Sequence, residues 1–207
     1  MPIAPLIIKG LYFSYPKFQV FTDFNFCSRA KIIILKGPSG CGKTTLLKLI
    51  SRILVPDSVA KFEVDEKSCY IVQEDSLLPW LSGTDNIHII LGIKSEQITS
   101  HPMYKLVGKF INQKAYTMSY GQRRLIEIFR AVLYKPSLLC LDEPLNFLDP
   151  VSRQSVVNSL NAPELNETRI ILSTHHSDEL DAVDAETYAF DGLFPIIRLN
   201  SQNEKDS

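Results

Sequence analysis

The segment 31–45 constrains the fold more than any other part of this 207-residue chain. It begins with a run of apolar residues typical of a strand, changes into a glycine-rich loop, and continues into residues 46–50, which have helical character. The loop fits the spacing G-x-x-x-x-G-K-[ST]. Its defining positions are Gly37, Gly42, Lys43 and Thr44. Glycines let backbone N–H groups turn inward around an anion, and the following helix directs its positive dipole end at the same point. The segment therefore predicts a phosphate-binding loop for a nucleoside triphosphate.

We expect every residue of this loop to line the phosphate site. The set is Gly37, Pro38, Ser39, Gly40, Cys41, Gly42, Lys43, Thr44 and Thr45. Lys43 would bring a mobile positive charge to the β- and γ-phosphates, and Thr44 would offer a hydroxyl to Mg²⁺. The alternative is a glycine- and serine-rich turn that carries Lys-Thr by chance. The strand before it and the helix after it favour the phosphate loop.

Length and composition restrict the class of protein. A chain of this size suits one α/β domain with a small insertion. With 22 Lys and Arg against 23 Asp and Glu, there is no basic excess, and we expect no nucleic-acid partner. The cysteines are scattered without a C-x-x-C pair, which indicates reduced thiols in the cytosol. The apolar N-terminus is short and contains two prolines, and no run approaches the roughly 20 apolar residues of a membrane helix.

Apolar runs and turn signals predict alternating strands and helices. Strands are expected at 6–15, 18–26, 31–36, 61–64, 69–72, 138–141, 169–174, 188–190 and 194–199. Helices are expected at 43–54, ended by Pro56, within 82–115, after Ser119 and after Asp149. This order predicts the α/β class: a mainly parallel sheet, an N-terminal antiparallel β part and a small helical insertion at about 80–135. We expect one domain over 1–199 and a disordered tail at 200–207.

Chemically active residues recur at the carboxyl ends of the expected strands, where α/β sheets bind ligands. Gln73, Asp142 and His175 each follow such a strand. Asp142 would hold Mg²⁺ together with Thr44, and Glu143 would polarise the attacking water. His175 would contact the γ-phosphate. Taken alone, the acidic pair would rather indicate a helix N-terminus or a solvated turn, and Gln73 and His175 could be ordinary loop residues. Their convergence on one edge favours the functional interpretation.

These motifs in this order resemble the nucleotide-binding subunit of ATP-binding cassette (ABC) transporters. Besides the loop, they comprise Gln73, Met118 to Gln122, Leu138 to Glu143, Asn146 to Asp149 and Thr174-His175. The resemblance implies a P-loop NTPase fold, ATP and Mg²⁺ as ligands, and ATP hydrolysis. It implies that Tyr15 stacks on adenine and that Gln73 joins Mg²⁺ to the membrane partner. Glu143 is then the catalytic carboxylate, and His175 is a switch residue at the γ-phosphate.

The resemblance also implies a head-to-tail dimer with a second copy of the chain. Ser119, Gly121 and Gln122 would close on ATP held by the partner, and Asp149 would line the contact. The chain departs from the family at Tyr120, where the motif Leu-Ser-Gly-Gly-Gln has glycine. We expect the Tyr120 ring to point away from the phosphate.

The stretch Leu77-Leu78-Pro79-Trp80 is similar to the corresponding segment of nitrate, sulfonate and taurine importers. It suits docking to an integral membrane permease, and such import systems can add a solute-binding protein. The alternative is that Leu77 and Trp80 pin the helical insertion to the core. The expected location is the cytoplasm, peripheral on the inner face of the cell membrane. The rival functions are a non-transport ABC ATPase and a regulatory or assembly module with low turnover.

Overall fold

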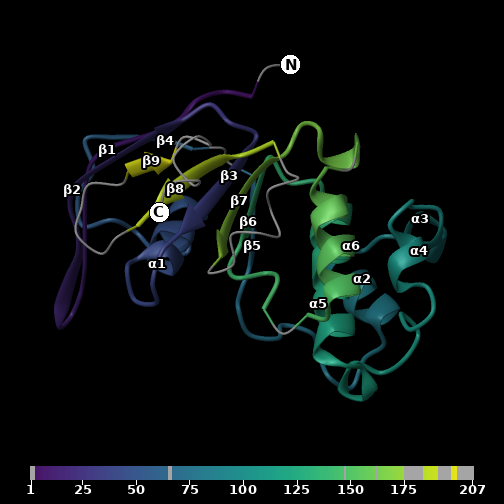
Figure 1. The fold of residues 1–207 in the computed structure, drawn as a ribbon. Helices are drawn as coiled ribbons and strands as arrows, with labels where there is room; N and C mark the ends of the chain where they lie inside the picture. The colour runs from purple at the N-terminus through teal and green to yellow at the C-terminus, as the bar shows by residue number, and fades with distance from the viewer. Residues whose placement is uncertain are drawn as a thin grey trace.

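Two β-sheets form the frame of the protein (Figure 1). The structure is a computed structural model that describes residues 3–64, 67–146, 148–161, 163–174, 184–190 and, by their backbone, 197–199. The smaller sheet is antiparallel, in the order β2 (Phe18–Ser28), β1 (Leu6–Tyr15), β4 (Lys61–Glu63). The larger sheet has the order β5 (Ser68–Ile71), β6 (Leu138–Leu141), β7 (Arg169–Thr174), β3 (Ile32–Lys36), β8 (Glu186–Ala189), β9 (Ile197–Leu199). Its described pairs are parallel except β8 with β9.

The helices divide between two sides of the larger sheet. In Figure 1, α1 lies beside the small sheet, whereas α2 to α6 gather at the far side. Their bounds are α1 Lys43–Ile50, α2 Gly83–Leu91, α3 Ser95–Thr99, α4 Tyr104–Val107, α5 Tyr120–Tyr134 and α6 Pro150–Leu160, with short 3₁₀ helices at Ala115–Thr117 and Pro163–Leu165. Within the described ranges, no helix is long and apolar enough to cross a membrane.

The predicted fold class is confirmed, and most predicted boundaries lie within two residues of the observed ones. The helix predicted at 43–54 is wrong at its end, because α1 stops at Ile50. Arg52 there has a positive φ of 61°, and the N–H groups of Ile53 and Leu54 donate back to the carbonyl of Lys48. This reversal ends the helix well before Pro56. The predicted tail at 200–207 lies outside the described residues.

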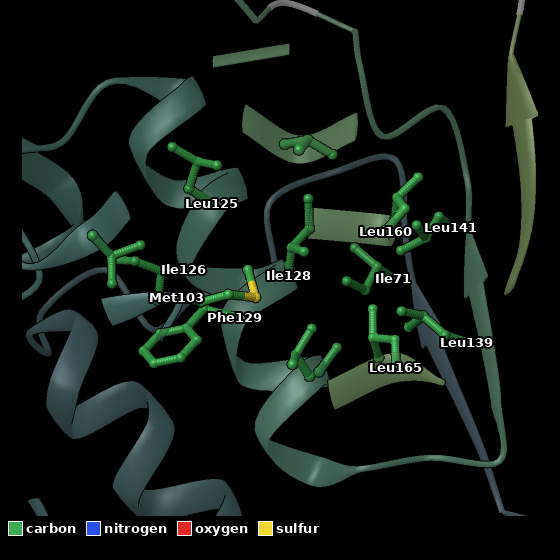
Figure 2. Close-up of a cluster of buried hydrophobic side chains, with 14 of the residues drawn as sticks. Ile71, Met103, Leu125, Ile126, Ile128, Phe129, Leu139, Leu141, Leu160 and Leu165 are labelled. Carbon is green, nitrogen blue, oxygen red and sulfur yellow. The ribbon is translucent and has the colours of Figure 1, made fainter. Parts of the chain in front are cut away.

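Alternating side chains of the parallel strands pack into two different clusters. Ile32 and Ile34 of β3 face a core shared with α5 and α6, whereas Ile33 and Leu35 face α1 and the small sheet. This is the period of two that a strand covered on both faces requires. Figure 2 shows the first cluster, where Leu139 and Leu141 of β6 lie near side chains of α5. The sheet is thereby fixed between two layers, and its carboxyl edge is held in place.

Local signals set the start of α5 as predicted. The Ser119 hydroxyl accepts a hydrogen bond from the Gln122 N–H at 3.2 Å, and the Gln122 side chain accepts one from the Ser119 N–H at 2.9 Å. This reciprocal capping box satisfies two N–H groups of the first turn. Apolar residues at helical spacing line the buried face of α5: Leu125, Ile128, Phe129 and Val132.

Asn86 of α2 organises the turn that precedes its helix. Its side chain is fully buried. The side-chain oxygen accepts from the Leu78 N–H at 2.7 Å, and the side-chain nitrogen donates to the carbonyls of Leu78 and Ser82 at 3.1 and 2.9 Å. These bonds fix the backbone of 78–82 against α2, so the turn depends on one buried amide.

We expect Asn86→Ala to lower the free energy of unfolding by about 2–3 kcal/mol, because it leaves buried backbone groups of the turn without partners. Chemical denaturation followed by circular dichroism measures this. Asn158→Ala, at an exposed position of α6, is the matched control and should change stability by less than about 0.5 kcal/mol. Equal stability of the two variants would contradict the assigned role of Asn86.

Candidate functional site

The carboxyl ends of four neighbouring strands meet at one edge of the larger sheet. Strand register pairs Lys36 with Thr174, Leu141 with Leu172, and Ile71 with Leu141. The loop at 37–42 follows β3, the acidic pair follows β6, and Gln73 follows β5. Parallel pairing therefore brings together three of the segments that the sequence predicted at one edge. His175 follows β7, but it lies outside the described residues.

The loop between β3 and α1 has the backbone of an anion cradle. Gly40 and Gly42 have positive φ angles of 81° and 103°. Gly42 precedes the first turn of α1, and no side chain in the described part of the protein caps that turn. The first N–H groups of the helix thus remain available to an anion, next to the positive end of the helix dipole.

The ammonium group of Lys43 lies inside this loop. It donates to the carbonyls of Gly37 and Pro38 at 2.7 and 2.9 Å, and it lies 3.7 Å from the Cys41 sulfur. Lys43 and Cys41 are 5% and 8% exposed, so both belong to the lining of the loop rather than to its outer surface. The loop therefore surrounds a positively charged group, the Lys43 ammonium, which could bind a phosphate.

Gly37 allows the loop to pack directly against Phe190, the residue that follows β8. A Cβ added at Gly37 would lie 2.2 Å from the Phe190 carbonyl oxygen. The Phe190 N–H donates to the Lys36 carbonyl at 2.7 Å, which keeps the two backbones in contact. The φ of Gly37 is 150°, at the edge of the region that side chains rarely adopt. Both the space and the conformation require glycine here.

Tyr15 lies beside the start of α1. Its hydroxyl is 3.5 Å from the Thr45 hydroxyl. Its ring packs against those of Phe13 and Phe18, with centroids 5.1 and 5.3 Å apart. Phe18 was not predicted as a site residue, yet it is 61% exposed and adjoins Tyr15 across the hairpin. Its position opposite Tyr15 beyond the Pro16-Lys17 turn is the signal that could have identified it.

Asp142 is buried and held by two hydroxyl groups. Its carboxylate accepts from Ser173 at 2.6 Å and from Tyr70 at 2.9 Å, and it is 2% exposed. Burial, followed by the charge of Asp142, raises the pKa of Tyr70, so its hydroxyl stays protonated and continues to donate. No local pattern in the sequence indicates Tyr70 or Ser173 as partners of Asp142, because they come from the two neighbouring strands.

Glu143 is set by its backbone and by Asn146. Its φ is 47°, in the left-handed region that non-glycine residues seldom occupy. Its N–H donates to the Ser173 hydroxyl at 2.9 Å, and its carboxylate accepts a short hydrogen bond from Asn146. Ser173 therefore contacts both acidic residues at once. Backbone conformation of this kind is concentrated at functional sites.

The predicted Mg²⁺ ligands are Thr44, Gln73 and Asp142. All three offer oxygen atoms, which is the donor type that Mg²⁺ prefers. Thr44 and Gln73 are exposed at the sheet edge. Both carboxylate oxygens of Asp142 already accept hydrogen bonds. That environment suits the predicted water-mediated role of Asp142, so the set fits the ion.

Ser119, Gly121 and Gln122 lie apart from the phosphate loop of their own chain. They lie at the start of α5, next to the segment that follows β5. The hydrogen bond from the Tyr120 hydroxyl to the Gln73 carbonyl, at 2.6 Å, joins the two. Two strands separate β5 from β3, a distance of about 14 Å at ordinary strand spacing. Asp149 is exposed and caps α6 by accepting from the N–H groups of Val151 and Ser152. The hydrogen bond that it accepts from the Ser152 hydroxyl, followed by the one from the Ser152 N–H, lowers the pKa of its carboxyl.

The chain is similar in sequence to known proteins. Residues 22–146 match the profile of the family described as ABC transporter. A taurine import ATP-binding protein of Escherichia coli O157:H7 is 34% identical over 192 residues, covering 84% of this chain and 74% of that protein. An aliphatic sulfonates import ATP-binding protein of Bacillus thuringiensis subsp. konkukian is 32% identical over 174 residues, covering 78% and 69%.

A solved structure of a metal-chelate type ABC transporter, in an inward-facing conformation, has a similar fold. Its TM-score is 0.79 at 24% identity, with 98% of this chain and 85% of that chain covered. At this identity the likeness bears on the fold alone.

We expect Gly37→Ala to lower the free energy of unfolding by about 2–4 kcal/mol, from overpacking against Phe190 and backbone strain, and to abolish nucleotide binding. Calorimetric titration with ATP and denaturant unfolding test both effects. Gly92→Ala is the matched control, since its φ is 65° but its Cβ would meet open space. It should lose only about 1–2 kcal/mol and bind normally. Normal binding by Gly37→Ala would refute the assigned geometry.

Proposed function

The chain belongs to the ABC transporter family, as an ATP-binding and ATP-hydrolysing subunit, and we propose that it powers solute import through a separate membrane permease. The observation that carries the proposal is the convergence of the phosphate loop, Asp142 and Glu143 on one sheet edge. The relatives named above are import proteins for taurine and aliphatic sulfonates, which supports import. The choice of solute would lie with the permease and a solute-binding protein.

ATP would bind across the loop and the hairpin of β1 and β2. Tyr15 would stack on the adenine ring, with Phe18 extending the aromatic surface. The phosphates would lie in the curve of residues 37–45 at the start of α1. Lys43 would exchange its bonds to the Gly37 and Pro38 carbonyls for bonds to phosphate oxygens. The position of the buried ammonium within the loop supports this exchange, because the charge would have only a short distance to move.

Mg²⁺ would be held by Thr44, by Gln73 and, through water, by Asp142. When bound, it neutralises the charge that builds up between the β- and γ-phosphates. Tyr70 and Ser173 keep the Asp142 carboxylate in one orientation. Glu143 would accept a hydrogen bond from the attacking water and orient it toward the γ-phosphate, while Asn146 fixes the carboxylate. His175 would contact the γ-phosphate.

We propose that two copies of the chain form the working unit. The separation of Ser119, Gly121 and Gln122 from their own phosphate loop supports their action on ATP bound by the partner copy. Asp149, which is exposed at the start of α6, would lie in the contact. Residues 1–199 would act as one nucleotide-binding domain, cytoplasmic and peripheral at the inner face of the membrane.

The permease would dock on the segment that follows Gln73. Leu77 is 7% exposed and packs in the core, so it serves the insertion. Trp80 is 62% exposed, and Tyr116, whose N–H donates to the Pro79 carbonyl at 3.0 Å, is 69% exposed. Exposed aromatic side chains beside a proline are typical of a binding surface. Nearby, Ser76 lines a cavity of about 230 Å³ together with Ile90 and Tyr134.

We expect Glu143→Gln to lower the ATPase rate by about 10²- to 10⁴-fold with ATP affinity retained, because the amide cannot accept the proton of the water. Phosphate release and ATP titration on the same preparation measure the two quantities. Glu167→Gln, at an exposed carboxylate, should leave the rate unchanged. Retained turnover in Glu143→Gln would remove Glu143 from the mechanism.

We expect Trp80→Ala to weaken the complex with the membrane protein that co-purifies with the wild-type chain. Truncating a central aromatic contact costs about 2 kcal/mol or more of binding free energy. Detergent pull-down followed by titration measures the loss, and ATP binding by the isolated variant shows that it is folded. Val55→Ala, at a 79% exposed position, is the control. Unchanged assembly with Trp80→Ala would exclude docking at this surface.

A further inference from the structure

The segment 72–76, which carries Gln73, is bonded to α5 by its backbone. Arg124 donates to the Val72 carbonyl through Nη1 and to the Gln73 carbonyl through Nη2, both at 2.7 Å. The Tyr120 hydroxyl donates to the same Gln73 carbonyl at 2.6 Å. Arg124 also lies 3.3 Å from the Tyr120 hydroxyl. The Gln73 carbonyl is therefore held by two side chains from the first two turns of one helix.

The other end of the segment is attached to the same helix. Glu127 accepts from the Ser76 N–H at 2.5 Å and from the Ser76 hydroxyl at 2.7 Å. Arg130 donates to the Ser76 hydroxyl at 2.9 Å, and Arg123 forms a short ion pair with Asp75. Each of these bonds joins residues 72–76 to α5, so both ends of the segment are attached to the same helix.

The centre of this network is a buried ion pair. Arg124 and Glu127 are 1% and 2% exposed, with 3.0 Å between Nη1 and Oε2. A buried pair is stabilised by hydrogen bonds to its other donors and acceptors. Here the carbonyls of Val72 and Gln73 accept from the two terminal nitrogens of Arg124, and the N–H and hydroxyl of Ser76 donate to Glu127, whereas Arg124 Nε has no hydrogen-bond partner among the described residues. The segment is thus part of what stabilises the pair, as well as being held by it.

Tyr120 is the residue that distinguishes this network from one that a family-typical glycine could form. Its ring lies 5.9 and 5.8 Å from the guanidinium carbons of Arg123 and Arg124. Both its hydroxyl and its ring are engaged with the segment and the helix of the same chain. The Tyr120 side chain therefore points toward Gln73 of its own chain.

We propose that Tyr120 and Arg124 are positioning residues that fasten Gln73 to the start of α5, so that Gln73 and the Ser119–Gln122 motif move together. The inference rests on the proposed function, in which Gln73 serves the ATP of its own chain and Ser119 that of the partner copy. The Tyr120 hydroxyl then links the position of Gln73 at the ATP of its own chain to the position of the Ser119–Gln122 motif at the ATP of the partner copy. Gln73 reaches its ligand only when α5 is correctly placed.

The test is a double-mutant cycle with Tyr120→Phe and Gln73→Ala in the assembled transporter. Tyr120→Phe keeps the ring and removes the hydroxyl. We expect it to lower kcat about three- to tenfold with KM for ATP unchanged, the size of one lost hydrogen bond. In the Gln73→Ala background it should have no further effect on kcat, because Tyr120 acts through Gln73. Tyr12→Phe, at a partly exposed position of β1, is the control for removing a hydroxyl.

The outcomes separate the inference from the function it rests on. Additive losses in kcat, a raised KM with normal kcat, or wild-type kinetics in Tyr120→Phe would each overturn the positioning role while leaving ATP-driven import intact. Absence of ATPase activity from the wild-type complex would instead overturn the proposed function. Similar Tm values for all variants in thermal unfolding would show that changes in kcat do not arise from loss of the fold.

Discussion

The parallel pairing of β5, β6, β7 and β3 determines which segments of the chain lie together. It places the segments after β3, β6 and β5 on one edge. A hydroxyl on β7, that of Ser173, can therefore contact Asp142 and the backbone of Glu143 together. A register shift of one residue would turn Ser173 to the opposite face and separate it from both. The contacts of Ser173 with both acidic residues therefore depend on the register of β6 and β7.

The two faces of the sheet carry different tasks. On one face, α1 and the small sheet surround the phosphate loop, and Tyr15 and Phe18 belong to this side. On the other face, α5 and α6 pack through a large apolar cluster that continues into the short helices of the insertion. The two clusters thus share the same strands, but they are built on alternate residues of those strands.

The parts of the fold that were predictable from sequence are those with local signals. The capping box at Ser119 and Gln122, and the cap and proline at Asp149 and Pro150, each act within one turn of helix. The end of α1 is predicted wrongly, because Pro56 predicts a stop near residue 54, whereas the chain reverses at Arg52. Tyr70, Ser173 and Phe18 were missed because their roles arise from pairing between segments distant in sequence or across a turn.

Tyr120 shows why an unusual residue in a motif can be understood only with its contacts. In the sequence it is a bulky ring in a place that calls for glycine, and the expectation was that it points away from phosphate. In the structure its hydroxyl donates to Gln73 and its ring lies beside Arg123 and Arg124. In the proposed function, Gln73 would meet two demands at once, because its side chain would reach a ligand while its backbone stays bonded to α5. Fixing the carbonyl and leaving the exposed side chain to the sheet edge satisfies both, and a glycine at 120 has no group with which to do so.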